Sequence, residues 1–226
     1  MSFQSLVNSY KDWYFYKTLE RSLSDCRDVL DVGCCAHSPL GKIKKTFRSE
    51  GVDIFRQSVA ESKKERNHDT YKIGDIRHIG QFYRPKSFDA VIAIDVIEHL
   101  TKKEAMQLIT DMEKIARKKV ILLTPNGFYH QDAYDNNPYQ VHKSGWSTKE
   151  LRDLGYRIRG VRGLKYVRGE YASIKYKPWI FWGVVAFVSE PLLSSMPGIS
   201  YDLFAFKDLR WSAKSNSKVV DKKIKI

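Results

Sequence analysis

The chain has 226 residues, 42% of them hydrophobic and 29% charged, and its 39 basic and 26 acidic side chains give a net charge of +13. This length and composition are those of one globular domain, and they exclude disordered, collagen-like and disulfide-rich chains. The three cysteines, Cys26, Cys34 and Cys35, follow no disulfide or zinc-binding pattern. Because the first residues lack the basic-then-apolar order of a secretory signal, we expect a cytoplasmic protein.

The first expected element is an aromatic-rich helix near the N-terminus. Leu6, Tyr10, Trp13, Lys17 and Glu20 recur there at helical spacing. We expect this helix to pack beside the first strand through ordinary core contacts, with a position over a ligand as the alternative.

An apolar strand at residues 29–32 then leads into a glycine turn that begins at Gly33. Ser38 and Pro39 are typical of a helix start. Leu40, Ile43 and Phe47 follow at helical spacing, so the pattern predicts a helix that ends at Gly51. In an open parallel sheet such a turn lies at the carboxyl end of a strand, where ligands bind.

The residues around this turn restrict the class of ligand. A dinucleotide fingerprint is disfavoured because Cys35 stands where G-x-G-x-x-G has its second glycine, and Gly41-Lys42 lacks the rest of a P-loop. Asp31 ends the first strand and Asp53 ends the next. Their separation is about the 20 residues expected between the turn and the ribose-binding acid of a nucleotide-binding fold. Carboxylates repel an anionic ligand but favour a cationic sulfonium.

Segments that follow in a fixed order resemble motifs of the class I S-adenosylmethionine-dependent methyltransferases. Residues 29–35 look like the motif in which an acidic residue precedes G-x-G, and Asp53 looks like the ribose-binding acid. Residues 71–76 resemble the adenine-binding segment, residues 87–100 the fourth strand with its E-H-L ending, and residues 120–127 the fifth strand with its loop. The resemblance, to type 11 domains and to the related quinone-biosynthesis O-methyltransferases, spans about residues 25–170.

The resemblance implies an α/β fold with one methyltransferase domain over residues 1–226. This fold is a doubly wound, seven-stranded, mostly parallel sheet of the Rossmann-like methyltransferase type, whose last strand is antiparallel. S-adenosylmethionine is the implied cofactor. The residues expected to hold it are Asp31, Gly33, Asp53, Asp75, Ile76 and Asp95. We expect Asp31, Asp53 and Asp75 side by side, because they follow three successive strands of such a sheet.

The later elements are marked by capping signals and apolar runs. Capping boxes that begin at Thr101 and Ser147 predict two helix starts, and the first of these helices has its apolar face on residues 105–116. We expect strand six at residues 156–161 and strand seven at residues 201–207.

Residues 176–200 are strongly apolar and contain two tryptophans beside Lys175 and Lys177. Spanning a bilayer takes about 20 uninterrupted apolar residues, which this segment lacks. It is therefore interpreted as a helix buried on the sheet, as a lid over the acceptor pocket, or as an interfacial insertion at an anionic membrane. Residues 212–226 are expected to form a basic, flexible tail.

We expect methyl transfer to an apolar small-molecule or lipid-linked acceptor, at oxygen. A hydroxyl acceptor must lose a proton, and His142 and His99 are the candidate bases. The alternatives are an RNA methyltransferase, suggested by the net charge, and a non-catalytic cofactor-binding protein at a membrane surface. No metal is expected; Asp95, Glu98 and His99 are the alternative set for a divalent ion.

Overall fold

A computed structural model describes residues 12–133, 137–168 and 175–210 of the chain. The strands are β1 (Asp28–Val32), β2 (Arg48–Asp53), β3 (Thr70–Ile73), β4 (Phe88–Ile94), β5 (Ala116–Pro125), β6 (Arg157–Leu164) and β7 (Ser200–Asp208). The α-helices are α2 (Trp13–Leu23), α3 (Arg56–Glu65), α4 (Lys102–Ile115), α5 (Thr148–Asp153) and α6 (Trp179–Leu193). Short 3-10 turns are η1 (Pro39–Lys42), η2 (Ile76–Gln81), η3 (Ile97–His99), η4 (Pro138–Gln140), η5 (Lys165–Val167) and η7 (Pro197–Ile199).

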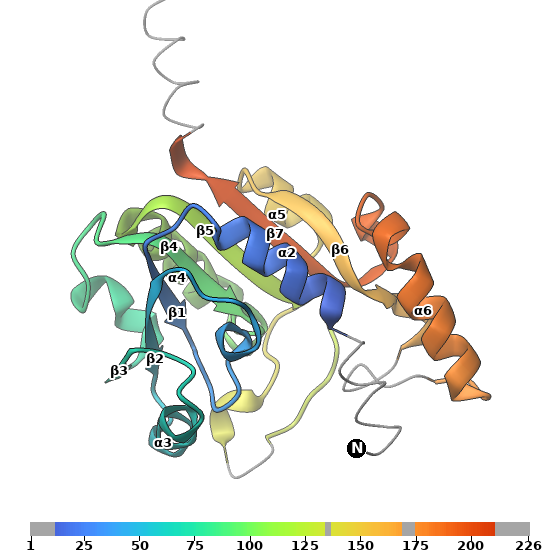
Figure 1. The fold of residues 1–226 in the computed structure, drawn as a ribbon, viewed down its shortest axis with the longest axis horizontal. Coiled ribbons are helices and arrows are strands. Elements are labelled where there is room, and N and C mark those ends of the chain that lie inside the picture. The colour runs from blue at the N-terminus through green and yellow to red at the C-terminus, as the bar shows by residue number, and fades with distance from the viewer. Residues whose placement is uncertain (1–11, 134–136, 169–174, 211–226) are drawn as a thin grey trace, which may run out of the picture.

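The seven strands form one sheet in the order β3-β2-β1-β4-β5-β7-β6, as Figure 1 shows. The first five strands are parallel, whereas β7 is antiparallel to both β5 and β6. Strand order reverses between β1 and β4, which is the place where ligands bind in doubly wound sheets. The predicted fold class is therefore confirmed.

Helices cover both faces of the sheet and give each face its own hydrophobic core (Figure 1). On one face α2 buries Phe15, Leu19 and Leu23 against the strands. On the other face α4 buries the apolar side that the sequence predicts, namely Ala105, Leu108, Ile109, Met112 and Ile115. Both predicted capping boxes are confirmed, because Thr101 and Ser147 each accept the backbone amide three residues on.

The predicted helix between the first two strands is wrong. Ser38 does cap a helical start, since its Oγ accepts the amide of Leu40, but only the single turn η1 forms and Ile43 is already extended. Strand pairing overrides the local spacing, because Arg48 and Ser49 pair with the start of β1. Leu40 and Ile43 are still buried in the core under α2, and the partly buried Phe47 packs against that core.

The other boundaries differ from the expectations by a few residues. Strand β6 continues to Leu164 through a bulge after Val161, and Ala116, expected on the face of α4, instead begins β5. Leu6 and Tyr10 of the expected first helix, and the expected tail 212–226, lie outside the described residues. In the described part of the chain, no helix is long and apolar enough to span a membrane.

Candidate functional site

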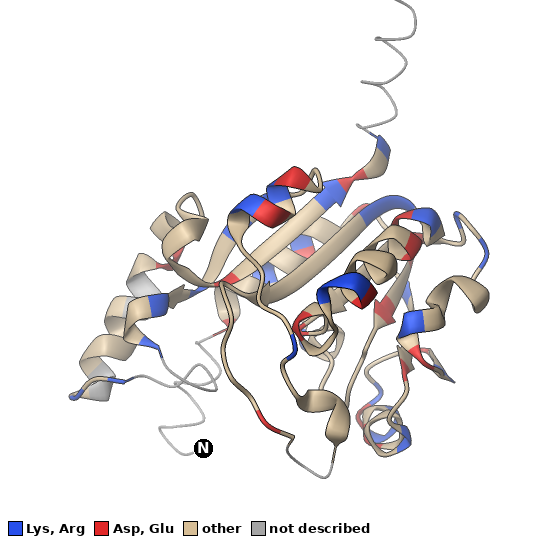
Figure 2. Ribbon diagram, turned by 180° about the vertical axis from the view of Figure 1, so that it is seen from behind, with Lys and Arg blue, Asp and Glu red and all other residues tan. Residues whose placement is uncertain are grey.

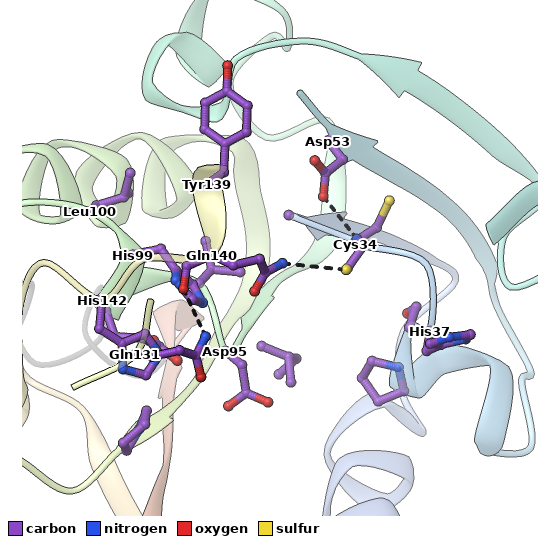
Figure 3. A pocket seen from close by; sticks show the side chains of 18 of the residues that line it. Cys34, His37, Asp53, Asp95, His99, Leu100, Gln131, Tyr139, Gln140 and His142 are labelled. Atoms are coloured by element: carbon purple, nitrogen blue, oxygen red, sulfur yellow. Dashed lines mark hydrogen bonds between the residues drawn. The ribbon is translucent and has the colours of Figure 1, made fainter. Parts of the chain in front are cut away.

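A cavity of about 520 Å³ opens at the carboxyl edge of the parallel strands. Its volume lies in the range of about 300 to 1,000 Å³ typical of ligand pockets. All the residues predicted for the site line it: Asp31, Gly33, Asp53, Asp75, Ile76, Asp95, His99 and His142. Figure 3 shows how side chains from the turn after β1, from the end of β2 and from the loop after β5 converge there. The topology thus brings together residues more than 100 positions apart.

The turn after β1 keeps the backbone path of a glycine-rich turn. Gly33 has φ +72°, and a Cβ at this position would lie 2.7 Å from the side chain of Val96, so a larger residue does not fit. Cys35, in place of the usual glycine, also has a positive φ of 48°. Its amide donates to Oδ2 of Asp53 at 3.0 Å, which supports this uncommon conformation.

Asp31 is buried beneath the turn. Ser38 Oγ donates to its Oδ2 at 2.5 Å, and Nε2 of His68 lies 3.4 Å from the same oxygen. Burial raises the pKa of Asp31 to about 7, and the Asp53 carboxylate also raises it. Burial lowers the pKa of His68 to about 4. The imidazole therefore stays neutral and does not form a true ion pair with Asp31.

The two other strand-end acids differ in how freely they face the cavity. Asp53 accepts the amides of Cys35 and Phe55, at 3.0 and 2.8 Å, and its pKa is raised by burial. Asp75 is exposed to the cavity but is held by the guanidinium of Arg77, whose Nη2 lies 2.6 Å from Oδ2. A ligand at Asp75 must share this carboxylate with Arg77 or displace it.

Asp95 belongs to an ion cluster that the sequence did not reveal. Its carboxylate lies 3.0 Å from Nη1 of Arg162, which also lies 2.8 Å from Asp202, while Nε of Arg162 donates to Asp12 at 3.0 Å. Although burial opposes its charge, the three carboxylates raise the pKa of Arg162 well above its usual value. Both Asp95 and Arg162 have positive φ, at 55° and 59°, and such strained residues concentrate at functional sites.

His99 and His142 lie against each other in the cavity, with ring centroids 4.7 Å apart. Each Nδ1 faces a backbone carbonyl, that of Val141 at 3.3 Å for His99 and that of Tyr129 at 2.7 Å for His142. A carbonyl can only accept, so Nδ1 carries the proton and Nε2 keeps its lone pair. Burial lowers the pKa of both imidazoles, to about 4 for His99.

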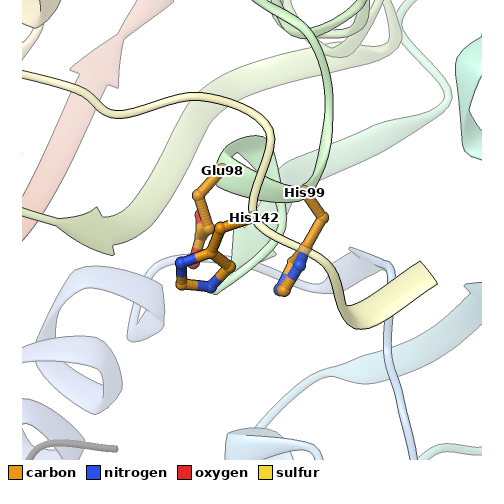
Figure 4. A group of neighbouring side chains, drawn as sticks. All are labelled: Glu98, His99 and His142. Carbon is orange, nitrogen blue, oxygen red and sulfur yellow. The ribbon is translucent and has the colours of Figure 1, made fainter. Parts of the chain in front are cut away.

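Glu98 completes this group (Figure 4). One ligand atom from each of Glu98, His99 and His142 lies within 4.8 Å of the others, so these three side chains could hold a metal ion. The Glu98 carboxyl is buried, accepts Thr124 Oγ1 at 2.9 Å, and has its pKa raised by burial and by Asp95. The set differs from the predicted alternative, because Asp95 pairs with Arg162 and His142 takes its place.

The loop after β5 closes one side of the cavity. Gln140 reaches from this loop to the turn after β1. Its backbone carbonyl accepts Gln131 Nε2 at 2.8 Å, and its side-chain Nε2 lies 3.9 Å from Sγ of Cys35 (Figure 3). Sequence reasoning missed Gln140, Arg162, Tyr201 and Asp202 as cavity residues. The position of Arg162 before Gly163 in a strand is the available sequence signal for it, because a glycine inside a strand often marks a bulge.

Residues 30–129 match the family model described as "Methyltransferase domain". No curated protein sequence matches the chain. An S-adenosylmethionine-dependent methyltransferase from Archaeoglobus fulgidus has a similar structure, with a TM-score of 0.54 at 18% identity over 87% of this chain and 100% of that one. Magnesium protoporphyrin IX methyltransferase from Synechocystis, with bound SAH, gives 0.52 at 16% identity over 92% and 88%. These likenesses show the fold.

Proposed function

We propose that this S-adenosylmethionine-dependent methyltransferase transfers a methyl group to an oxygen atom of an apolar small-molecule or lipid-linked acceptor. The domain match and the fold support the activity and the cofactor. The observation that carries the oxygen acceptor is the pair of neutral imidazoles, His99 and His142, inside the cavity. A hydroxyl must lose its proton during transfer, so it needs a base beside it.

The residues of the cavity fit a cationic nucleoside. Asp31, Asp53 and Asp75 stand at the carboxyl ends of three adjacent strands, and their carboxylates favour a positively charged ligand. When bound, S-adenosylmethionine supplies the activated methyl group. Asp53 would hold the ribose hydroxyls, because its two carboxylate oxygens accept backbone amides on one side and can accept further hydrogen bonds from a ligand in the cavity. Gly33 lets Val96 pack directly against the turn, since any Cβ there would clash with the valine side chain.

His142 is the preferred base, since it comes from the loop that closes the cavity. The Tyr129 carbonyl fixes its ring with the proton on Nδ1, and Nε2 would accept the proton of the hydroxyl. Its lowered pKa keeps this nitrogen unprotonated at neutral pH. His99 packs edge-on against His142 and holds the ring in place.

A divalent cation at Glu98, His99 and His142 is the second candidate for activating the acceptor. One nitrogen of each imidazole and one carboxylate oxygen lie close together there, and the carbonyls at the two Nδ1 atoms orient the rings as in metal sites. Exhaustive chelation separates the two candidates: the base mechanism predicts unchanged turnover, and the cation mechanism predicts its loss.

The walls of the cavity support an apolar acceptor. Phe15, Tyr16, Tyr129 and Tyr201 line it, and the last two rings lie 5.1 Å apart. The case for RNA is weaker, because Arg162 and Arg168, two of the basic residues near strand six, turn inward instead of forming a phosphate-binding surface.

A cell extract incubated with the protein and an isotopically labelled methyl donor tests this proposal. After extraction with organic solvent, mass spectrometry should find the label in a methyl ether or ester of the apolar fraction. Label in RNA, or on nitrogen of an aqueous metabolite, would contradict the proposed acceptor.

A further inference from the structure

Helix α6 is unusual because nearly all its residues are apolar, on every side. Glu190 is its one ionisable residue. A helix that is apolar all round is normally buried within a protein. Here α6 packs on the edge strand β6 and otherwise extends from the end of the molecule, as Figure 1 shows. At 15 residues it is about 22 Å long, too short to cross a bilayer.

The inner side of α6 is fixed to β6. Glu190 is buried, and its Oε1 accepts the amide of Arg162 at 2.8 Å. Gly160 lies directly under the carbonyl of Leu193, where a Cβ would approach to 2.4 Å. The carboxyl group of Glu190 therefore faces the protein and not the solvent, and the helix has a defined outer side.

The outer side carries large apolar side chains in the open. Phe181 and Val184 are each 56% exposed and Leu192 is 72% exposed, and their spacing places the three on one face of the helix. Met196, just after the helix, is 57% exposed. Several large apolar side chains exposed on one face of a helix mark an interaction surface.

The charges around this patch are basic. Lys175 and Lys177 precede α6 and are exposed, and Lys165 lies over the ring of the exposed Tyr166 in the adjoining turn η5. In the described residues 175–196 Glu190 is the single acid, and it is buried. In Figure 2 the coloured part of α6 is accordingly almost all tan, with hardly any of the red that marks acidic residues. If two copies of the chain paired through this face, the lysines of one copy would find no carboxylate on the other. Anionic lipid headgroups, in contrast, complement the lysines.

The aromatic residues lie at the same end as the lysines. Tyr176 and Trp182 have ring centroids 5.6 Å apart, and Tyr176 is 51% exposed. Tyrosine and tryptophan prefer the boundary between headgroups and acyl chains, where an apolar ring and a polar tip are both satisfied.

We propose that α6 lies in the interfacial layer of a membrane that contains anionic lipid, with Phe181, Val184 and Leu192 among the acyl chains and Lys175 and Lys177 at the headgroups. The role of this membrane contact in catalysis rests on the proposed function. Arg162, which bonds to Glu190 of α6, lines the cavity together with Tyr201. A membrane-bound α6 thus sets the acceptor side of the cavity next to the bilayer, where a lipid-linked acceptor resides.

Flotation of the full chain with vesicles tests the proposal. The protein should float with vesicles of phosphatidylcholine and phosphatidylglycerol, and more weakly with phosphatidylcholine alone or in high salt. Changing Lys175 and Lys177 to Ala should weaken partitioning to the anionic vesicles about 30-fold. The double variant F181E/V184E should no longer float. The matched control is M106E, because Met106 is an exposed apolar residue on α4, far from α6 in the chain, and it should float like the wild type.

Three results would overturn the proposal. The first is equal flotation of F181E/V184E and M106E, and the second is no flotation of the wild type with either vesicle. The third is a loss of self-association in F181E/V184E by analytical ultracentrifugation without vesicles, which would assign the face to a second copy. Unchanged cofactor binding by F181E/V184E shows that the variant is folded. If the wild-type protein transfers methyl groups but does not float with vesicles, only the membrane proposal is refuted. If it floats but transfers no methyl group, only the proposed function is refuted.

Discussion

Nε2 of His68 lies 3.4 Å from Oδ2 of Asp31, and both side chains are almost entirely shielded from solvent. The contact is not a charge pair, because burial keeps the imidazole neutral and raises the pKa of the carboxyl to about 7. Asp31 therefore changes its charge near neutral pH, beneath the turn that is proposed to hold a cation. The first prediction follows from this arrangement.

Binding of S-adenosylmethionine should depend on the ionisation of Asp31. The carboxylate is charged above its pKa of about 7, and a cationic ligand favours the charged form. Affinity should therefore rise with pH up to about 7, by at most tenfold per pH unit, and then level off. Calorimetry across this pH range measures the effect. The D31N variant should show a flat profile, and a rise of the same size in D31N would refute the assignment.

Replacing Asp53 by Ala should weaken cofactor binding by about 10- to 100-fold, as expected for lost hydrogen bonds to a charged group. Asp69 provides the control, because it also accepts a backbone amide, that of Ser49 at 2.7 Å, but does not line the cavity. Equilibrium binding of S-adenosylmethionine should be reduced in D53A and unchanged in D69A. Equal losses in the two variants would mean that Asp53 acts only on the backbone.

Replacing His142 by Ala should lower kcat by about 100- to 10,000-fold, the range of general base catalysis. Cofactor affinity should stay the same, since the imidazole acts on the acceptor. The H99A variant should lose less activity, because His99 supports the ring of His142. His78, which lies outside the main cavity, is the control. Full activity of H142A in steady-state assays would exclude it as the base.

Arg162 should be required for stability as well as for the site. Its side chain is 19% exposed, and R162M would leave the carboxylate of Asp202, which is 1% exposed, without its counterion inside the protein, while Asp95 faces the cavity. Breaking a buried ion cluster in this way costs about 3 to 5 kcal/mol. R210M is the control: Arg210 also pairs with two carboxylates but is 47% exposed, so its loss should cost at most about 1 kcal/mol. Urea unfolding of both variants measures the difference, and equal midpoints would contradict the prediction.

The strand-end acids were predictable because local pattern and topology agree there. Asp31, Asp53 and Asp75 each follow an apolar or alternating run, and a parallel sheet must place such ends at one edge. The backbone between the first strands was not predictable. Leu40, Ile43 and Phe47 have helical spacing, but the pairing of Arg48 with Asp28 decides the outcome, and that contact is not local.

The ion cluster at Arg162 could not be predicted from the sequence for a similar reason. Its partners Asp95 and Asp202 lie 67 and 40 positions away, and only the antiparallel insertion of β7 beside β6 brings them together. The left-handed backbone of Arg162 adds to the difficulty, since arginine seldom adopts it. His142 could be selected as a loop residue, whereas its contact with His99 needed the fold.

Helix α2 also bears on how the protein should be handled. Phe15 packs in the core against Phe204 and faces the guanidinium of Arg162, whose Cζ lies 5.1 Å from the ring, while Asp12 at the start of the helix bonds to the same arginine. A shortened version that begins after Ser24 would have two defects. It would lack the helix that buries one face of the sheet, and it would lack Asp12 as a counterion of Arg162. Affinity tags and protease cleavage sites therefore belong ahead of Asp12, where they leave both contacts intact.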